Sequence, residues 1–425
     1  MSLLRSNRKG RAGATAGKAM ALVGMVALAA SACGKSSTST TATTTGGATS
    51  ATTTGGPATT AAGTGGSCTS PTGATGPGVG TTTIGFIYVG STSDFGYNQA
   101  AHAGADALKA ACPNFKILEA PETPETSNMV TVAEQMIGQG AKIIFSTSYG
   151  YKDYAVTVAT KHPDVVVMQQ GNALTPPVLP NMNEYFGDVY QTVYLGGIAA
   201  AKATKSNKLG FIAAFPVPQT IANIDAFELG AQSVNPAIQT FTVLTGAWCD
   251  PAKQADAANS LIGQGVDVIS QHQDCTSTII KTAEAKGVYT VGYHYNAQSL
   301  APQGWLTGSE WQWGPLYIAM VKSIMAGKFT GSPFNTNYTA GFTSTDVASP
   351  LSLAPFGPSV SGDTKALIAT AKAKILAGTS PFTGPITDQA GTVRIPAGQM
   401  ATADQLSAIC YLVKGVVGTV PACKS

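Results

Sequence analysis

The chain has 425 residues, enough for two domains of ordinary size, and 44% of them are hydrophobic. Charged residues make up only 11% of the chain, against roughly 25% in an average soluble domain, and the formal net charge is +3. This composition excludes a coiled coil, a collagen, a highly charged disordered protein and a polytopic membrane protein.

The positive charge comes from the N-terminus and not from the body of the chain. Residues 1–32 carry five of the 25 basic residues and no acidic residue, which leaves 20 bases against 22 acids in the remainder. Proteins bind nucleic acid largely by neutralising phosphates with Lys and Arg. We therefore expect no nucleic-acid partner.

Residues 1–32 have the pattern of a signal peptide. Basic residues precede the apolar run 19–32, which is too short to span a bilayer. The run ends at Ala30-Ser31-Ala32-Cys33, which resembles a bacterial lipobox, although Ala30 stands where a branched aliphatic residue is usual. We predict cleavage before Cys33, lipidation of its thiol, and a protein that is exported and anchored by lipid to the outer face of the bacterial cell membrane. The alternative is ordinary secretion, with Cys33 removed or free.

Residues 33–80 are mostly Thr, Gly, Ser and Ala, and Lys35 is their one charged residue. Such a segment has too little apolar surface to offset the entropy lost on ordering it. We predict a flexible tether between the lipid anchor and the folded body.

Six cysteines remain if Cys33 is lipidated, and six cysteines allow fifteen pairings. An exported chain meets an oxidising compartment, which favours disulfides. The sequence leaves the pairing open, and the set that we prefer is Cys68–Cys112, Cys249–Cys275 and Cys410–Cys423. None of the six has the C-x2-C spacing of a zinc site, so we expect no metal.

From residue 81 the sequence alternates strand and helix. The run 83–89 is continuously apolar and β-branched, which indicates a strand buried on both faces. Residues 98–111 follow as a helix with Ala and Leu along one stripe. The alternation continues with strand 116–120, helix 127–139, strand 142–146, helix 151–161, strand 165–169 and the small-residue helix 190–204.

A second series of the same kind begins near residue 208. It comprises strand 208–213, helix 221–234, strand 238–244, helix 251–264, strand 266–270, helix 276–286 and strand 289–292. Repeated β-α units predict parallel sheets with helices on both faces, and two series predict two lobes. We expect an α/β fold in which each lobe is an open parallel sheet.

The candidate ligand-binding residues lie in the segments that follow these strands, because ligands of open parallel sheets bind beyond the carboxyl ends of the strands. Aromatic rings there would stack on a flat heterocycle, and polar side chains would orient it. The candidates are Asp94, Phe95, Tyr97, Asn98, Tyr149, Gly171, Phe215, Trp248, Gln271, Asp274, Tyr293, His294, Glu310 and Trp311. The alternative for each aromatic residue is core packing, and for Asp274 it is a helix N-cap.

At these residues the sequence resembles the basic membrane protein family of ABC-transporter substrate-binding lipoproteins. The segments that carry the resemblance include IGFIYVGSTSDFGYNQA (84–100), FSTSYGY (145–151), DPAKQADAANSLIGQGVDVISQHQD (250–274) and GVYTVGYHYN (287–296). With segments near residues 384–386 and 415–418, it covers about four fifths of the chain. The resemblance implies the type I periplasmic-binding-protein fold, with a hinge of three crossovers, and capture of purine nucleosides or bases for a membrane permease.

The resemblance also implies roles for single residues. Tyr97 matches the stacking aromatic residue of the first loop, Asn98 the polar contact beside it, and Tyr149 an aromatic residue of a later loop. Nucleoside-binding members have an Asp that grips the ribose near the position of His294, and a Lys where Trp311 aligns. Because a site without partners for ribose hydroxyls binds them poorly, we favour an adenine-like nucleobase over a nucleoside.

The resemblance and the element pattern together predict how the lobes divide. We place the N-terminal lobe at 81–197 with 297–337 and the C-terminal lobe at 198–296 with 338–425. The lobe crossings are expected near 195–203, 296–302 and 335–342. We expect a monomer that closes about this hinge on its ligand.

Catalysis is not expected, and neither is a cofactor. The sequence has no P-loop, no G-x-S-x-G elbow and no H-E-x-x-H, and its four histidines are dispersed. Two other readings of the same fold stay open: a binding protein for a sugar or another small polar solute, and a ligand sensor for a membrane receptor.

Overall fold

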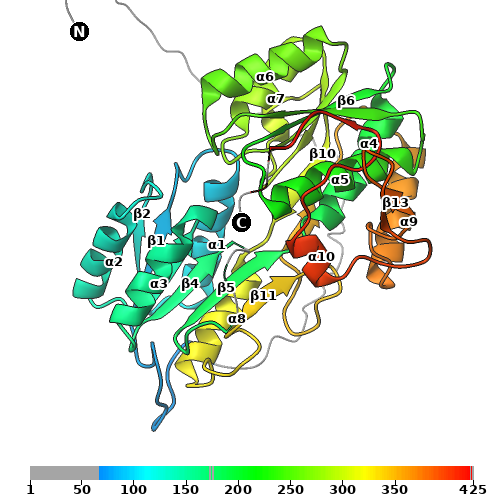
Figure 1. The fold of residues 1–425 in the computed structure, drawn as a ribbon. Coiled ribbons are helices and arrows are strands. Elements are labelled where there is room, and N and C mark those ends of the chain that lie inside the picture. The colour runs from blue at the N-terminus through cyan, green and yellow to red at the C-terminus, as the bar shows by residue number, and fades with distance from the viewer. Residues whose placement is uncertain (1–66, 172–173, 175–176, 422, 424–425) are drawn as a thin grey trace, which may run out of the picture. The chain divides into compact units, whose positions relative to one another are not determined.

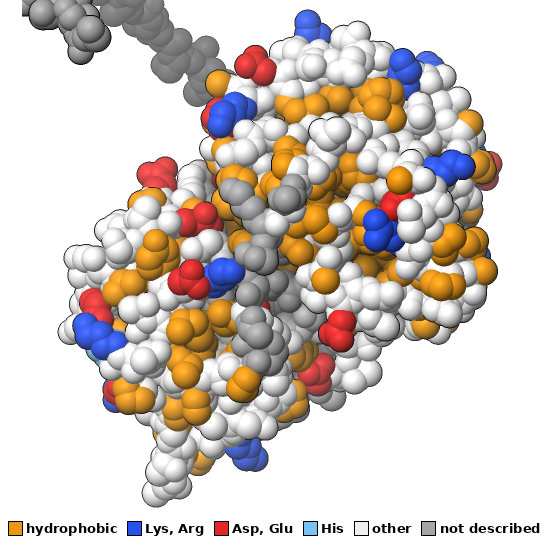
Figure 2. Space-filling view, viewed as in Figure 1, with side chains coloured by type: hydrophobic (Ala, Val, Ile, Leu, Met, Phe, Trp, Pro, Cys, Tyr) orange, Lys and Arg blue, Asp and Glu red, His pale blue; other side chains and the backbone are white. Residues whose placement is uncertain are grey.

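The computed structural model describes residues 67–171, 174, 177–421 and 423 (Figure 1). The predicted signal peptide, Cys33 and most of the predicted tether lie outside the described residues. Within the described ranges, no helix has both the length and the apolar character needed to cross a bilayer. Figure 2 shows charged side chains scattered sparsely over the visible face, as the low content of charged residues predicts.

The first sheet has six parallel strands in the order β11-β5-β4-β3-β1-β2. Its strands are β1 (Thr83–Tyr88), β2 (Lys116–Ala120), β3 (Ile143–Thr147), β4 (Val166–Gln170), β5 (Met182–Gly187) and β11 (Asn337–Ala340). In the centre, Ile84 pairs with Ile143 and Phe86 with Phe145, and all of these side chains are fully buried.

Helices cover both faces of this sheet. Alternate residues of β1 serve the two faces: Phe86 lies in the core cluster of α1 (Tyr97–Ala111) and α8 (Gly314–Met325), and Ile87 lies in that of α2 (Asn128–Gly138) and α3 (Lys152–Lys161). This two-sided burial explains why the strand is a continuous apolar run.

The second sheet has seven strands in the order β12-β10-β9-β8-β6-β7-β15 and is parallel except at β12. Its strands are β6 (Lys208–Ala213), β7 (Gln239–Leu244), β8 (Val268–His272), β9 (Tyr289–Gly292), β10 (Trp305–Trp311), β12 (Leu351–Leu353) and β15 (Val416–Val417). Helices α6 (Pro251–Gly263) and α7 (Ser277–Ala285) cover one face, and α4 (Tyr190–Ala203) and α5 (Pro218–Gln232) cover the other. The remaining elements are α9 (Gly362–Leu376), β13 (Ile386–Thr387), β14 (Val393–Ile395) and α10 (Ala403–Ser407).

Helices α4 and α5 pack closely because each presents a glycine to the other. A Cβ on Gly197 would lie 2.1 Å from the carbonyl oxygen of Phe227, and a Cβ on Gly230 would lie 2.0 Å from that of Tyr194. Any larger residue would force the two backbones apart. The small-residue composition of helix 190–204 therefore has a packing cause.

The chain crosses between the sheets at 187–190, 311–314 and 340–351. Two of these positions differ from the predicted crossings, and the third shifts the predicted lobe boundary at 337 to the end of β11, which pairs with β5. Helix α4 packs on α5 and β10, so the first crossing precedes this helix and does not lie within it. Strand β10 pairs in parallel with β9, so the second crossing follows residue 311, whereas we expected it near 296–302.

The end of the predicted tether is packed on the first lobe, which corrects its boundary. Cys68 forms a disulfide with Cys112, at the end of α1. Gly78 is buried, its amide donates to the carbonyl of Asp164, and a Cβ on it would lie 2.7 Å from Ile324. The described residues 67–80 are thus part of the folded body.

The structure pairs the six described cysteines as Cys68–Cys112, Cys249–Cys275 and Cys410–Cys423, which is the set that the sequence analysis prefers. Their Cα–Cα distances are 5.7, 5.2 and 5.8 Å. Distances in this range allow a disulfide without movement of the backbone.

Two buried carboxyl groups on α5 lie beside the C-terminal segment, and one of them, Asp225, bonds this segment directly. Asp225 accepts a hydrogen bond from the amide of Val413 at 2.9 Å, and Glu228 accepts from Thr240 Oγ1 at 2.6 Å and Gln232 Nε2 at 2.7 Å. Both carboxylates are fully buried, and desolvation raises the pKa of Glu228 to about 7. The edge strand β15 pairs with β7 beside them.

We expect the Glu228→Gln variant to lose less stability than the wild type between pH 5 and pH 8. Between the ordinary pKa of 4.5 and about 7, the native carboxyl is protonated while the unfolded one is ionised, so the native state binds more protons and its stability falls as the pH rises. The contribution lost across this window is on the order of 3 kcal/mol. Urea unfolding at pH 5, 6, 7 and 8 measures it.

The control is Asp256→Asn, an exposed position on α6, which should keep the wild-type pH dependence. An unchanged difference between pH 5 and pH 8 in Glu228→Gln would show that this carboxyl is ionised in the native state throughout.

Candidate functional site

One small cavity lies between loops at the carboxyl ends of the two sheets. Four of the predicted residues line it together with four that were not predicted; its lining is Tyr97, Ser148, Tyr149, Phe186, Gln219, Trp248, His272 and Asp274. Both lobes contribute to this lining. The cavity volume is about 10 Å³, roughly the space of one water molecule, so a flat heterocycle enters only if the rings or the lobes move apart.

Trp248 is the centre of the aromatic contacts on the outer side of the cavity. Its ring lies 5.1 Å from that of Phe215, 6.0 Å from that of His272 and 6.4 Å from that of Tyr149, between ring centroids. Trp248 and Phe215 follow strands β7 and β6, whereas Tyr149 follows β3 of the first sheet. Aromatic faces from both lobes therefore meet here.

A second set of rings continues from His272 to Tyr97. The Tyr293 ring lies 4.6 Å from His272 and 3.8 Å from His294, and His294 lies 5.0 Å from Tyr97. Tyr97 is only 6% exposed, and it is the first residue of α1 in the first lobe. The predicted rings Tyr97, Tyr293 and His294 are thus brought together.

His272 lines the cavity, although it is not among the candidate ligand-binding residues. Asn223 Nδ2 lies 2.9 Å from His272 Nδ1 and donates to the Tyr293 hydroxyl at 2.8 Å, so α5 orients both rings. Burial lowers the pKa of His272 to about 3, and the imidazole is neutral at physiological pH. Its position as the last residue of β8, next to Gln271, is the sequence signal for its place at the cavity.

Asp274 supplies the carboxylate of the cavity. It is 6% exposed, and desolvation, followed by the charges of Asp94 and Glu125, raises its pKa well above the ordinary value. Among the described residues, no hydrogen bond reaches this carboxylate from the protein. The carboxyl group is therefore available to a hydrogen-bond donor on a ligand.

Asp94 and Asn98 belong to the start of helix α1 and do not line the cavity. The Asp94 carboxylate accepts hydrogen bonds from the amides of Gly96, Asn98 and Gln99 at 2.8, 3.1 and 3.0 Å. The Asn98 side chain donates to Asp94 at 2.8 Å and accepts from the amide of Gly90 at 3.0 Å. Their polar groups thus fix the first turn of the helix.

His294 and Trp311 form a buried pair next to the second lobe crossing. Trp311 Nε1 donates to His294 Nδ1 at 2.7 Å, and the Trp311 ring stacks on Trp313 at 4.4 Å. Burial, followed by the proximity of His272, lowers the pKa of His294 well below its ordinary value. Trp311 also lies 5.2 Å from the cavity residue Phe186, so it supports the cavity from the hinge side.

The other predicted residues lie outside the cavity lining. Gly171 donates its amide to Tyr185 at 3.1 Å, and Gln271 Nε2 donates to the carbonyl of Thr276 at 3.4 Å. Glu310 accepts from Ser352 at 3.2 Å, and desolvation raises its pKa. Phe95 turns into an apolar cluster of the second lobe.

A larger groove of about 830 Å³ shares Tyr149, Phe186 and Gln219 with the cavity. It runs past the first crossing, at Asp188, towards α10. None of the described residues that line it is Lys, Arg or His. Its volume lies within the range of small-molecule sites.

The described residues contain no group of three or more His, Cys, Asp and Glu side chains arranged to hold a metal ion. The cavity contains aromatic faces, amides, neutral imidazole and one carboxyl group. Groups of these kinds can stack on a small planar molecule and form hydrogen bonds with it.

Comparisons with known proteins give the family of this chain. A profile of the Bmp family, described as PnrA-like ABC transporter substrate-binding protein, matches residues 81–339. A purine-binding protein of Brucella abortus is 34% identical over 340 residues, which cover 80% of this chain and 93% of that protein. A Haloferax volcanii protein, named as a candidate ABC transporter glucose-binding protein, is 31% identical over 302 residues, which cover 71% of this chain and 74% of that protein.

Solved structures of lower identity have the same fold. A solute-binding protein of an ABC transporter system from Conexibacter woesei has a TM-score of 0.58 at 22% identity and covers 70% of this chain and 96% of its own. One from Aeropyrum pernix has a TM-score of 0.59 at 18% identity and covers 77% and 95%. The predicted α/β fold is confirmed, and the family and fold are those of solute-binding proteins. The chain belongs to the Bmp family of PnrA-like ABC transporter substrate-binding proteins.

Proposed function

We propose that this protein is the extracytoplasmic binding component of an ABC importer and that it captures a purine between its two lobes. The observation that carries the proposal is the composition of one cavity: Tyr97 and Tyr149 reach it from the first lobe, and Trp248 and Asp274 from the second. The purine-binding relative, which aligns over 93% of its length, supports the same ligand class.

The chemistry of the cavity suits a purine. Flat rings stack on a heterocycle, and stacking on aromatic side chains contributes roughly 1–3 kcal/mol per base. The Asp274 carboxyl group would accept from a ring or exocyclic N–H, and the neutral His272, whose Nδ1 accepts from Asn223 Nδ2, would donate through Nε2. Binding would draw the rings apart from one another, because the present cavity of about 10 Å³ is smaller than a base.

Within this class we propose a nucleobase rather than a nucleoside. His294, near the position where nucleoside-binding relatives of this fold have a ribose-binding Asp, is 1% exposed, and its Nδ1 is occupied by Trp311. No carboxylate or ammonium therefore clamps ribose hydroxyls at these two positions, and unpaired hydroxyls in a buried site weaken binding.

The cellular setting completes the proposal. Cleavage before Cys33 and lipidation of its thiol would anchor a monomer to the outer face of the membrane, from which it delivers its ligand to a permease.

A sugar is the second candidate ligand, because the Haloferax relative is named for glucose and covers 71% of this chain. Aromatic faces bind sugars as well as bases, so a competition experiment between a base and a sugar is needed to show which of them is the ligand.

Titration calorimetry with adenine, adenosine and glucose tests the proposal. We expect adenine to bind, adenosine to bind at least tenfold more weakly, and glucose neither to bind nor to displace adenine. Native mass spectrometry of freshly purified protein identifies any ligand that is retained. Tighter binding of adenosine would overturn the preference for a base, and displacement of adenine by glucose would overturn the purine assignment.

The Tyr97→Ala variant should bind adenine roughly 5- to 150-fold more weakly, because it removes one stacking face worth about 1–3 kcal/mol. Tyr97→Phe is the matched control: it keeps the ring and should stay within about threefold of the wild type. Calorimetric dissociation constants for the three proteins make the comparison. Equal losses in both variants would assign the effect to the hydroxyl and not to stacking.

A further inference from the structure

Loop 94–97 of the first lobe is hydrogen-bonded to the second lobe beside the cavity. The amide of Tyr97 donates to the carbonyl of Asp274 at 3.1 Å, and the amide of Thr276 donates to the carbonyl of Asp94 at 3.3 Å. These are bonds between the backbones of two lobes. They form only when the lobes approach each other.

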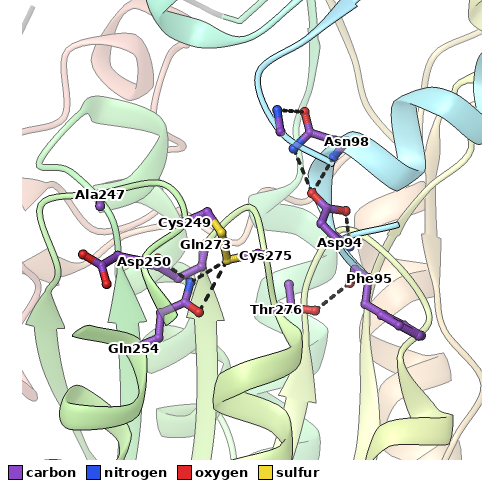
Figure 3. Close-up of a disulfide and its surroundings, with 12 residues drawn as sticks. Asp94, Phe95, Asn98, Ala247, Cys249, Asp250, Gln254, Gln273, Cys275 and Thr276 are labelled. Carbon is purple, nitrogen blue, oxygen red and sulfur yellow. Dashed lines mark hydrogen bonds between the residues drawn. A yellow bond between two sulfur atoms is a disulfide. The ribbon is translucent and has the colours of Figure 1, made fainter. Parts of the chain in front are cut away.

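Phe95 crosses from the first lobe into the second. Thr276 Oγ1 donates to its carbonyl at 2.6 Å, as Figure 3 shows. Its ring packs against a cluster of second-lobe residues that includes Ile280, Ala301 and the fully buried Trp305. Its φ of +54° is a left-handed conformation that costs free energy for any residue with a Cβ. The contacts across the lobes compensate for that cost.

Gly96 permits the close approach. A Cβ at this position would lie 1.7 Å from the carbonyl oxygen of Asp274, which is backbone and cannot move aside as a flexible side chain would. With any other residue at position 96, the two segments could not meet as they do here.

Both sides of the contact are held in place before they meet. On the first lobe, the Asp94 carboxylate is fixed by amides of the first turn of α1. On the second lobe, the disulfide Cys249–Cys275 ties the receiving segment to the loop of Trp248, and Gln254 Nε2 lies 3.3 Å from the sulfur of Cys275 (Figure 3). Preformed surfaces lose less conformational entropy when they associate.

We propose that residues 94–97 are a latch that holds the two lobes closed through its own contacts with residues 274–276 and the Phe95 cluster. The latch acts without any ligand, so the inference goes beyond the proposed function. Because apparent affinity scales with the fraction of molecules in the binding-competent conformation, the latch also tightens the binding of any ligand that needs the closed form.

Small-angle X-ray scattering of the ligand-free protein tests the latch. The wild-type profile should fit the closed arrangement, and Gly96→Ala should give a larger radius of gyration. Thr276→Val, which removes one hydrogen bond and keeps the bulk of the side chain, should shift the profile less and in the same direction. The control is Gly138→Ala at the end of α2, where an added Cβ meets no atom within 4 Å, and which should match the wild type.

Adenine titration of the same four proteins gives a second readout. If the closed fraction falls to a tenth in Gly96→Ala, the apparent dissociation constant rises about tenfold. A ligand-free Gly96→Ala profile identical to that of the wild type would overturn the latch, and so would an open wild type. If adenine binds to none of the proteins, the proposed function fails, while the scattering still decides the latch. Circular dichroism shows whether Gly96→Ala is folded. If it is not folded, the scattering profile of Thr276→Val tests the latch in its place.

Discussion

The parallel direction of the strands is the constraint on which the rest of the structure depends. Parallel strands need a crossover between each pair, so helices cover the faces of both sheets, and the loops that follow the parallel strands lie at the same edge. Loops that are far apart in the sequence, such as those holding Tyr97, Tyr149 and Trp248, therefore meet at one cavity. If one strand ran in the opposite direction, its loop would lie at the far edge of the sheet, and its side chain would be lost from the site.

The sequence predicts a strand where its buried residues are apolar and form a local pattern. It fails to predict a strand whose buried residues are polar and find their hydrogen-bond partners in distant parts of the chain. Residues 84–88 are recognisable as a strand because they are apolar and buried on both faces. Strand β5 is equally buried but contains Asn183 and Glu184, and Glu184 accepts a hydrogen bond from the amide of Leu174 at 2.8 Å. Strand β10 carries the polar run 307–310, and its place in the second sheet depends on pairing with β9. Such tertiary pairing has no signal in a single sequence, which is why the lobe boundaries differ from the prediction.

The site shows the same division. The rings at strand ends could be predicted because the topology alone places them at the carboxyl edge. Asp94 and Asn98 are polar residues at such an end as well, but their hydrogen bonds go to the start of α1. Gln219 lines the cavity from the first turn of α5, and Phe186 lines it from within β5, a strand without an apolar pattern. Backbone geometry decides which polar side chains form hydrogen bonds within their own loop and which ones face the cavity. This geometry cannot be read from a single sequence.

Burial would also determine how the proposed site distinguishes ligands. His272 is neutral because desolvation lowers its pKa to about 3, and no Lys or Arg is among the described residues that line the cavity, so this lining has no cation with which to attract an anion. Recognition would then depend on stacking and on paired hydrogen bonds. The net free energy of binding is the difference between the contacts that the rings make with the ligand and the contacts that they make with one another when the ligand is absent. A latch that favours closure shifts this balance in two ways: it raises the fraction of binding-competent molecules, and it makes opening for ligand entry more costly.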